Sequence, residues 1–482
     1  MNEDMMTQIK REAGKYADIY RGVALIADPI YGYALFTIPS DDETEKTEKD
    51  LIDSPWVQRL RRIYQLQTAR WVYPSAEHTR FQHSLGTMHN ASEFGKALYK
   101  SLKSVCDDLP SLPFVEELLR IAGLLHDIGH GPYGHFFDDH FLNQYDTTHE
   151  HIGQQIIVKE LAPIISAIRR SPSGAFARNE KIDPAYVAYL IRIPDERAPA
   201  VMWPQWLRFL RQLFTGIYTV DNLDYVQRDA YMTGFALDLV DVKRLLHYSF
   251  YSSEGLTLHQ TGISALNRFL NARLNLYSNV YFHRTTRALD LHLQEIFRDT
   301  MNLILPSFNP LDDLERYLRC DEWSLFAETQ EWPHSPKKKK QELGKEWRKL
   351  FQREVKWKMS FSMEIPIDQV QWGTKLLRQE DYEGHIRENL PPGKKDIVFQ
   401  VDLATQDPRP LNPISESEKR IHIFDPVTGK ISLEPLKEIF RFIPARVVHF
   451  RIFSLHHDDD EILSKAAEKP LNALGNMSRT NV

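Results

Sequence analysis

The chain has 482 residues, of which 42% are hydrophobic and 26% charged, a composition that is typical of globular proteins and excludes wholesale disorder. Its 60 basic and 66 acidic side chains give a net charge of −6, so there is no global positive field for DNA or for an anionic membrane. No stretch approaches the roughly 20 apolar residues of a membrane span, and the charged N-terminal segment lacks the apolar core of a secretory signal. Together with a cysteine content of only Cys106 and Cys320, these features predict a cytoplasmic protein that does not bind membranes.

The first predicted elements are two short strands, residues 23–26 and 30–36, joined by a turn at Asp28-Pro29. Residues 40–50 are so polar that we expect an exposed loop. A helix should begin next, with Asp53 or Ser54 as its N-cap and Pro55 in its first turn. Hydrophobic periodicity predicts further helices over residues 81–102, 114–127, 147–161, 184–192, 204–216 and 221–231, and one long helix over 262–302.

The composition changes at residues 331–349, where two prolines precede four consecutive lysines. We interpret residues 326–357 as a basic linker or connecting helix, with the lysines on a solvated face rather than in a phosphate-binding patch. Strand-like alternation follows at 397–403, 420–424, 430–433 and 447–455, with a hairpin turn at 425–429. The sequence therefore predicts a mainly α protein: a helical domain with an N-terminal strand pair over 1–325, a smaller α+β region over 358–465, and a flexible tail over 466–482.

Histidine is concentrated in one part of the chain, because nine of the 19 histidines fall between residues 78 and 151. Such a cluster indicates a metal site or proton-transfer chemistry. His126 and Asp127 stand together where an apolar helix is predicted to end. Adjacent helical side chains point about 100° apart, so both can reach one ion only at a helix terminus or with help from other segments. Imidazole and carboxylate ligands suit Fe, Mn, Zn or Co, among which the sequence does not choose.

Polar side chains also follow one face of the helix predicted over 221–231. Asp221, Tyr225 and Asp229 are spaced i, i+4 and i+8, which extends over about 12 Å of one helix face. One end could meet a metal and the other a substrate hydroxyl, although a surface helix with Asp–Arg pairs is the simpler interpretation. The predicted long helix carries a second stripe, in which arginines that would suit a phosphate-facing groove flank aromatic residues more typical of a core: Arg273, Tyr277, Tyr281 and Arg284.

Several motifs occur in a fixed order: DPIYGY at 28–33, QRLRRIYQL at 58–66, HTRFQHSLG at 78–86, GLLHDIGHGPYGH at 123–135, THE at 148–150 and DNLDYVQRD at 221–229. In these motifs, and near residues 273–284, the chain strongly resembles the HD-domain deoxynucleoside triphosphate (dNTP) triphosphohydrolases. That family includes bacterial dGTPases and the SAM-and-HD-domain dNTPases. The resemblance covers roughly residues 22–300. It implies an HD-type helical fold and metal-dependent hydrolysis of dNTPs to the deoxynucleoside and inorganic triphosphate.

The resemblance implies a catalytic centre with two groups of residues. The metal ligands would be His83, His126, Asp127 and Asp221. A catalytic set near the α-phosphate would orient a water or protonate the leaving 5′-oxygen, and it comprises His130, His135, Asp138, His149 and Glu150. For Glu150 an alternative carries equal weight, because Thr147-x-x-Glu150 also has the pattern of a capping box that opens the next helix.

The resemblance also implies a substrate site and a Mg²⁺ ion bridging the nucleotide phosphates. Arg80 would contact the α-phosphate and the base, while Gln65 and Asp229 would bind the sugar 3′-hydroxyl. Leu66 and Tyr281 would crowd the 2′-carbon and exclude ribose. The other implied substrate contacts are Asn222, Tyr225, Arg273 and Arg284.

Two departures from the family pattern leave the nucleotide open. SAM-type enzymes have a phosphate-contacting lysine where this chain has Asn222, whose amide supplies no charge. Gln67 stands where many relatives have glycine. An alternative substrate is therefore a cyclic nucleotide, a guanosine polyphosphate or a nucleoside monophosphate. A third hypothesis, a sensor of nucleotides or single-stranded nucleic acid without turnover, is disfavoured by the complete set of metal ligands.

A regulatory site is implied by four further positions. Asp53, Gln58 and Arg61 match residues that hold an activating guanine nucleotide between subunits in SAM-type relatives, and His283 matches a residue at a second regulatory nucleotide. A carboxylate with Gln and Arg can pair with the edge of guanine. The alternative is that Asp53 caps the helix beginning at Pro55 and Arg61 pairs with an acid. The resemblance thus implies a homo-oligomer, a dimer or tetramer, activated by GTP or a dNTP.

Overall fold

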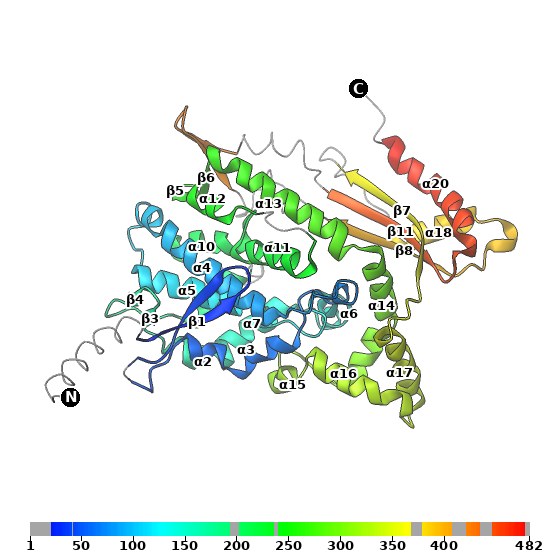
Figure 1. Cartoon of the computed structure of the whole chain (residues 1–482), viewed down its shortest axis with the longest axis horizontal. Coiled ribbons are helices and arrows are strands. Elements are labelled where there is room, and N and C mark those ends of the chain that lie inside the picture. The colour runs from blue at the N-terminus through cyan, green and yellow to red at the C-terminus, as the bar shows by residue number, and fades with distance from the viewer. Residues whose placement is uncertain are drawn as a thin grey trace, which may run out of the picture.

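The computed structural model of the chain describes residues 21–40, 42–192, 202–235, 240–367, 378–406, 421–433 and 446–477 (Figure 1). Helices dominate it, so the prediction of a mainly α fold with small sheets is confirmed. None of the described helices has the length and apolar composition needed to cross a membrane. Both cysteines are buried and unpaired. Residues 1–20, residue 420 of a predicted strand and residues 478–482 of the predicted tail lie outside the described residues.

The predicted N-terminal strand pair forms an antiparallel hairpin, β1 (Val23–Asp28) and β2 (Gly32–Thr37), in register from Val23↔Thr37 to Asp28↔Gly32. Its turn is closed by Asp28, whose Oδ1 accepts hydrogen bonds from the backbone N–H groups of Ile30 and Tyr31 at 2.8 and 3.1 Å. Gly32 takes a positive φ of 78°, which glycine adopts without steric cost.

The exposed loop predicted for residues 40–50 is wrong in its second half. Thr47 and Glu48 are buried, and Glu48 begins helix α2 (Glu48–Ile52). The Glu48 carboxylate accepts from Arg120 Nε at 2.7 Å and from the backbone N–H of Thr37 at 2.8 Å. The polar segment therefore packs inside because a buried arginine, distant in sequence, neutralises its charge.

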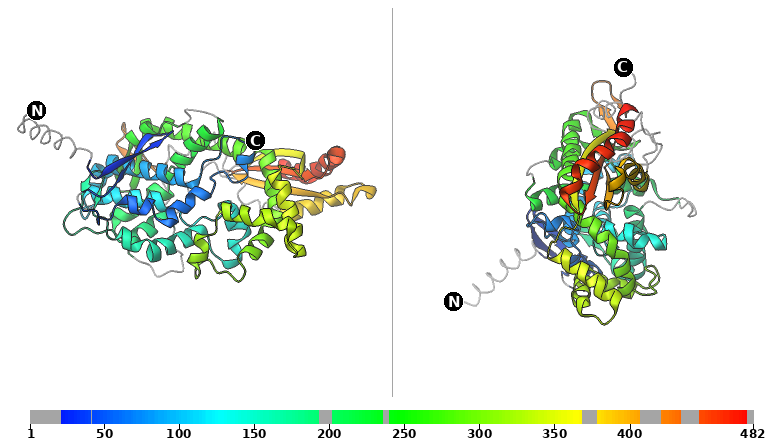
Figure 2. Two further views of the ribbon diagram at one scale, coloured as in Figure 1. Left: turned by 60° about the horizontal axis from the view of Figure 1, so that its bottom comes forward. Right: turned by 90° about the vertical axis from the view of Figure 1, so that its right-hand side faces the viewer.

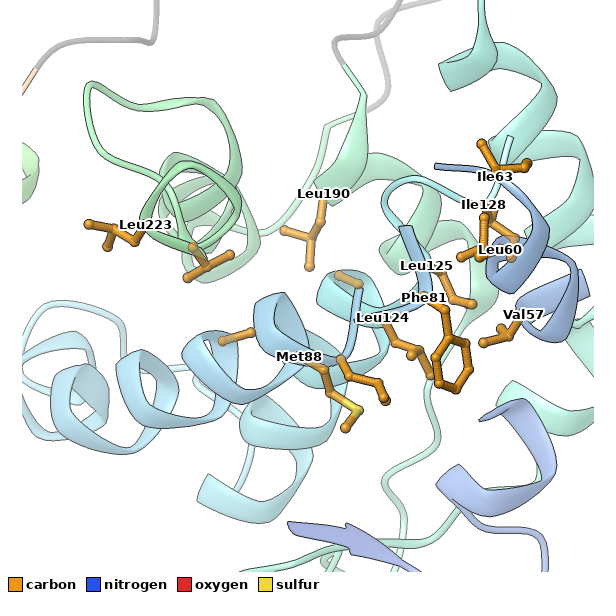
Figure 3. Close-up of a cluster of buried hydrophobic side chains, with 14 of the residues drawn as sticks. Val57, Leu60, Ile63, Phe81, Met88, Leu124, Leu125, Ile128, Leu190 and Leu223 are labelled. Atoms are coloured by element: carbon orange, nitrogen blue, oxygen red, sulfur yellow. The ribbon is translucent and has the colours of Figure 1, made fainter. Parts of the chain in front are cut away.

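The helical core is organised around α4 (Arg80–Lys103) and α5 (Leu112–Leu125), which pack closely together. Gly123 permits this approach, since a Cβ there would lie 2.8 Å from the carbonyl oxygen of Thr87. Apolar side chains from both helices and from the segment before them fill the interior, as Figure 3 shows for Val57, Leu60, Phe81, Met88 and Leu124. Helix α11 (Val220–Thr233) packs against α4 and completes the frame of the site.

The structure decides the N-caps of two predicted helices. Helix α3 (Pro55–Arg59) is short and ends in a 3₁₀ turn, and its N-cap is Ser54, whose Oγ accepts from the N–H of Val57. Helix α7 (His149–Gln155) has Thr148 as N-cap, so the capping box from Thr147 to Glu150 does not form. The remaining helices of this part are α6 (His135–His140), α8 (Ala162–Ile165), α9 (Pro184–Ile191), α10 (Gln205–Thr215), α12 (Val242–His247), α15 (Leu314–Leu318) and α16 (Glu322–Glu331).

The long helix predicted over 262–302 is interrupted. It consists of α13 (Ile263–Leu276), a π-helical turn (Tyr277–Tyr281) and α14 (Arg284–Ile304). His283 has extended dihedral angles and caps α14 by accepting from the N–H of Thr285 at 3.3 Å. Because the chain changes direction here, Arg273 and Arg284 do not share one helix face as the spacing predicted. Single π-helical turns of this kind occur frequently at functional sites.

Helix α17 (Lys338–Phe351) lies within the segment that we interpreted as a linker or connecting helix. It packs on α14 and α16, and its Trp347 is buried and donates to Thr300 Oγ1 at 2.9 Å.

The C-terminal region is built on an antiparallel sheet in the order β7 (Lys358–Ile367), β11 (Arg446–Ser454), β8 (Phe399–Gln406). Helices α18 (Gln379–Asn389) and α20 (Asp460–Met477) cover one face, where Phe450 and Ile452 join their side chains in a second core. Side chains of the opposite face contact α14, among them Phe453, which packs with Ala288. Figure 2 shows this unit at the other end of the molecule from the β1–β2 hairpin.

Two predictions for the C-terminal region need correction. The hairpin of β9 (His422–Asp425) and β10 (Lys430–Ser432) leaves that region and pairs in parallel with β6 (Gly255–His259), next to β5 (Ser249–Ser252). The flexible tail does not begin at residue 466, because α20 continues to Met477 and Ala466 and Ala467 are buried against the sheet. A last two-stranded ribbon pairs β3 (Arg170–Ser171) with β4 (Gly174–Ala175).

Candidate active site

The side chains predicted as metal ligands converge where α4, α5 and α11 meet. His83 Nε2 lies 3.0 Å from Asp221 Oδ1, 3.1 Å from His126 Nε2 and 3.7 Å from Asp127 Oδ2. His126 Nε2 lies 3.4 Å from Asp127 Oδ1 and 3.6 Å from Asp221 Oδ1. His126 and Asp127 can both reach this point because α5 ends at Leu125 and His126 is its C-cap.

The geometry and chemistry of this donor set fit a divalent transition metal. Donor atoms about 2.1 Å from one ion stand about 3.0 to 3.4 Å apart in octahedral or tetrahedral geometry, close to the spacings above. Both imidazoles present Nε2 to the centre because their Nδ1 atoms are engaged elsewhere. His83 Nδ1 donates to Asp224 Oδ2 at 2.7 Å, and His126 Nδ1 donates to the carbonyl oxygen of Gly123 at 2.8 Å. Hydrogen bonds of this kind fix the tautomer of metal-binding histidines.

Asp224, which the sequence analysis missed as a site residue, is fully buried behind His83. Its carboxylate accepts two hydrogen bonds from Arg228, both 2.9 Å, and one from the Tyr31 hydroxyl at 2.9 Å. Burial favours the neutral acid, but the Arg228 guanidinium and His83 hold the pKa of Asp224 well below its usual range. Gly86 makes room for this carboxylate, since a Cβ there would lie 1.9 Å from Asp224 Oδ1. The sequence feature that could have identified Asp224 was its position within the motif at residues 221–229.

Four members of the predicted catalytic set form a second cluster. The rings of His130 and His149 stack with centroids 3.6 Å apart. His149 Nδ1 is hydrogen-bonded to Asp138 Oδ2, and His135 Nδ1 lies 3.8 Å from the same oxygen. His130 Nε2 lies 3.3 Å from Asp127 Oδ1, so this cluster adjoins the ligand set.

The two ends of this cluster carry different charges. Burial, reinforced by the Arg80 guanidinium, holds the pKa of His130 well below its usual range, so its ring is neutral near pH 7. Burial opposes ionisation of Asp138, but hydrogen bonds from His135 and His149 lower the pKa of that carboxyl. The cluster therefore keeps an ionised carboxylate between histidines.

A cavity of about 320 Å³ opens beside the metal ligands. It contains these predicted residues: Gln65, Leu66, Arg80, His83, Asp127, His135, Asp221, Tyr225, Asp229 and Tyr281. Two more lining residues are Gln67, noted above as a departure from the family pattern, and Tyr277, part of the aromatic stripe, but neither was predicted as a site residue. The remaining lining residues were not mentioned in the sequence analysis: Thr68, Ala69, Phe282, Thr286, Arg287 and Asp290.

Hydrogen bonds fix the middle of the cavity but leave several polar atoms unused. Asp229 Oδ2 accepts from the Tyr281 hydroxyl at 2.5 Å, and its Oδ1 lies 2.8 Å from His78 Nε2. Among the described residues, Gln65 Oε1 and Arg80 Nε are buried without a hydrogen-bond partner. Buried polar atoms are normally paired, so these two mark where a polar ligand would be held.

Four residues predicted to act in catalysis or substrate binding belong neither to the ligand set nor to the histidine cluster and do not line this cavity. Arg284 is exposed at the start of α14 and lines a separate hollow with Trp357. The predicted substrate contact of Arg284 therefore needs correction, because the break before α14 turns this residue away from the stripe of Arg273. Arg273 is adjacent, because its Nε donates to the hydroxyl of Tyr225 at 3.0 Å. Asn222 and Glu150 are half-buried in the first turns of α11 and α7, and neither lines the cavity.

The predicted regulatory residues lie on the surface around α3 and at the start of α14. Asp53 ends α2 and pairs with Lys49 at 2.7 Å, so it does not cap the following helix. Arg61 Nε donates to Gln58 Oε1 at 2.9 Å, and the guanidinium stacks 3.7 Å from the centre of the Phe81 ring. Arg61 thus pairs with an amide rather than with an acid, and the regulatory role stays a prediction.

Comparison with known families identifies this arrangement. Residues 80–188 match the HD domain, and residues 240–403 match the HD associated region. The chain belongs to the HD phosphohydrolase superfamily. This HD protein is 29% identical to the uncharacterized protein MG461 of Mycoplasma genitalium, over 58% of this chain and 60% of that one. It is 28% identical to the uncharacterized protein YwfO of Bacillus subtilis, over 63% and 65% of the two chains.

A third relative carries a functional name. The human deoxynucleoside triphosphate triphosphohydrolase SAMHD1 is 25% identical over 80% of this chain and 61% of its own length. The HD protein thus spans about three fifths of the length of these curated relatives. Solved structures share its fold. A hypothetical protein from Aquifex aeolicus has a TM-score of 0.64 at 22% identity, covering 92% of this chain and 99% of that chain. A phosphohydrolase from Bacteroides thetaiotaomicron has a TM-score of 0.62 at 21% identity, covering 90% and 100%.

Proposed function

We propose that this HD protein is a metal-dependent hydrolase that converts dNTPs to the deoxynucleoside and inorganic triphosphate. One observation carries the proposal: the lining of a single cavity contains three of the four proposed cation ligands, His83, Asp127 and Asp221, together with Leu66 and Tyr281. The fourth ligand, His126, lies 3.1 Å from His83. Relatives named as dNTP triphosphohydrolases support the same reaction.

At the metal end, His83, His126, Asp127 and Asp221 would hold the cation. A bound cation of this class polarises a phosphoryl oxygen and lowers the pKa of water. Arg80 donates to Asp127 Oδ2 at 2.5 Å, which orients that ligand, and its unpaired Nε is available to an oxygen of the α-phosphate. The arginine thereby compensates charge that develops on the phosphate.

The histidine cluster would handle the proton on the leaving group. His135 is the member of that cluster that lines the cavity, and 67% of its side chain is exposed. We assign it the transfer of a proton to the leaving 5′-oxygen, with the ionised Asp138 stabilising the protonated ring. His149, hydrogen-bonded to Asp138, would fix the orientation of that carboxylate.

The sugar section would select deoxyribose. The hydrogen bond from the Tyr281 hydroxyl to Asp229 prevents the ring from moving aside, and Leu66 is buried in the facing wall. Side chains held in this way on both sides of the sugar would leave no space for a 2′-hydroxyl, so ribonucleotides would be excluded sterically. The free Gln65 Oε1 would accept from the sugar 3′-hydroxyl.

The predicted assembly belongs to the same proposal. A dimer or tetramer activated by GTP or a dNTP would place guanine near Asp53, Gln58 and Arg61, where the Phe81 ring already stacks on a guanidinium. Mg²⁺ would accompany the nucleotide phosphates, and the cytoplasm would be the site of action.

The test is incubation of the purified protein with each dNTP and NTP in Mn²⁺ or Mg²⁺, with chromatographic separation of inorganic triphosphate, pyrophosphate and phosphate. Inorganic triphosphate released from dNTPs alone is the expected result. The assay includes three further substrate classes: cyclic nucleotides, guanosine polyphosphates and nucleoside monophosphates. If one of these is hydrolysed and dNTPs are not, that class is the substrate. Nucleotide binding without turnover under every condition would make the protein a sensor.

A further inference from the structure

The cavity lining also contains a charged pair that the proposed reaction does not use. Arg287 and Asp290, both on α14, line the cavity, and 25% and 12% of their side chains are exposed. Arg287 Nη1 donates to Asp290 Oδ2 at 3.0 Å. The Thr68 hydroxyl, from a segment distant in sequence, donates to Asp290 Oδ1 at 2.5 Å and holds the carboxylate.

Arg287 is fixed from behind by the C-terminal sheet. Its Nη2 donates to Asp402 Oδ1 at 2.6 Å, and its Nε lies 3.1 to 3.2 Å from both carboxylate oxygens of the same residue. Asp402 is buried on β8 and lies 3.8 Å from Arg451 on the neighbouring strand. A bidentate pair of this kind holds the guanidinium plane in one orientation.

The pair retains hydrogen-bonding capacity that points to a ligand. A guanidinium has five N–H donors, of which three are used here, so two remain. Each oxygen of Asp290 accepts one hydrogen bond from protein and keeps one lone pair. The result is a pair of donors directly beside a pair of acceptors.

We propose that Arg287 and Asp290 form a base-recognition subsite specific for guanine, an inference that rests on the proposed function. Guanine presents the acceptors N7 and O6 followed by the donors N1–H and 2-amino along one edge. Arg287 would donate to N7 and O6, and Asp290 would accept from N1–H and the 2-amino group. Adenine, cytosine and thymine lack a pair of adjacent donors, so each would leave an acceptor of Asp290 unpaired in a partly buried site, which is costly.

The experiment compares kcat/KM for dGTP, dITP, 7-deaza-dGTP and dTTP in the wild type, Asp290→Asn and Arg287→Gln. Wild type should prefer dGTP over dITP, which lacks the 2-amino group, by about 10-fold to 100-fold. Asp290→Asn should abolish that preference, while Arg287→Gln should abolish the preference for dGTP over its 7-deaza analogue. Asp299→Asn is the matched control, because Asp299 lies on the same helix but pairs with Lys339 outside the cavity.

Equilibrium binding of dGTP and dITP analogues in which a methylene group replaces the 5′-oxygen, whose bond to the α-phosphorus the proposed reaction breaks, separates this inference from the proposed reaction. Absence of dNTP hydrolysis with a guanine preference in binding that Asp290→Asn removes would uphold the subsite and overturn the reaction. Equal kcat/KM and equal binding of dGTP and dITP in wild type would overturn the subsite. So would an Asp290→Asn variant that loses the same factor for every nucleotide, because that result assigns the pair to structure alone.

Discussion

The two ends of the cavity are held in different ways. At the metal end, His83 and His126 stand on packed helices, and their outward nitrogens are fixed by Asp224 and a backbone carbonyl. At the other end, Arg287 follows a break in the helix and takes its orientation from Asp402, on a strand of the C-terminal sheet. The proposed metal ligands are therefore held by contacts within the helical core, whereas the proposed discrimination among bases depends on a second unit. The four predictions below address this difference.

The largest effect is expected at the metal end. Asp127→Ala removes an anionic ligand and leaves the buried Arg80 guanidinium without its partner, so hydrolysis should fall by more than about 1,000-fold and the bound metal should decrease. Turnover and metal content by mass spectrometry measure the two outcomes. Full activity together with unchanged metal content would contradict the assignment of this site.

A buried acid behind the metal end should control stability rather than chemistry. Glu322 accepts from the backbone N–H groups of Tyr64 and Tyr133, and burial raises the pKa of its carboxyl to about 7. A carboxyl group whose pKa is higher in the folded chain than in the unfolded chain stabilises the fold at pH values below its unfolded pKa. This contribution is lost as the pH rises through the folded pKa. Wild type should therefore lose about 2 to 3 kcal/mol of unfolding free energy between pH 5 and 8 through this group.

Glu322→Gln cannot titrate, so urea unfolding at pH 5 and pH 8 should show that loss reduced by about 2 to 3 kcal/mol. The control is Glu331→Gln, an exposed position at the end of the same helix. An unchanged pH profile in Glu322→Gln would show that this carboxyl is ionised throughout the range.

At the other end, Asp402→Asn weakens the support of Arg287 without touching the substrate. The ratio of kcat/KM for dGTP to that for dITP should fall by about 10-fold, while metal content stays at the wild-type level. Asp396→Asn, exposed just before β8, is the matched control. An Asp402→Asn variant that keeps the wild-type ratio of kcat/KM for dGTP and dITP but binds less metal would show that Asp402 supports the metal ligands rather than Arg287.

The smallest effect is expected for Asn222→Lys. A lysine at this half-buried position outside the cavity adds a charge that solvent screens, so the KM for dNTPs should fall by no more than about threefold. Initial-rate kinetics at two salt concentrations measure it. A tenfold or larger decrease would place residue 222 directly against the phosphates.

Much of the metal end could be predicted from the sequence because its determinants are local. His126 and Asp127 end an apolar helix whose period is plain, and Asp221, Tyr225 and Asp229 keep one face at i, i+4 and i+8. His83 was added to the predicted ligands only by the resemblance of the ordered motifs to the HD-domain triphosphohydrolases. The strand pair at the N-terminus was equally predictable, because alternation and an Asp-Pro turn specify a hairpin.

Tertiary structure decided the rest, because it depends on pairs that are distant in sequence. Glu48 looks solvent-exposed until Arg120 is seen beside it, and Arg284 appears to continue the stripe of Arg273 until the chain turns at Tyr277–Tyr281. The orientation of Arg287 likewise cannot be predicted without its partner Asp402, which is distant in sequence. Hydrophobic periodicity determines which helix faces are buried, but the energy of a buried charge is set by its partner, and only the folded chain brings the two together.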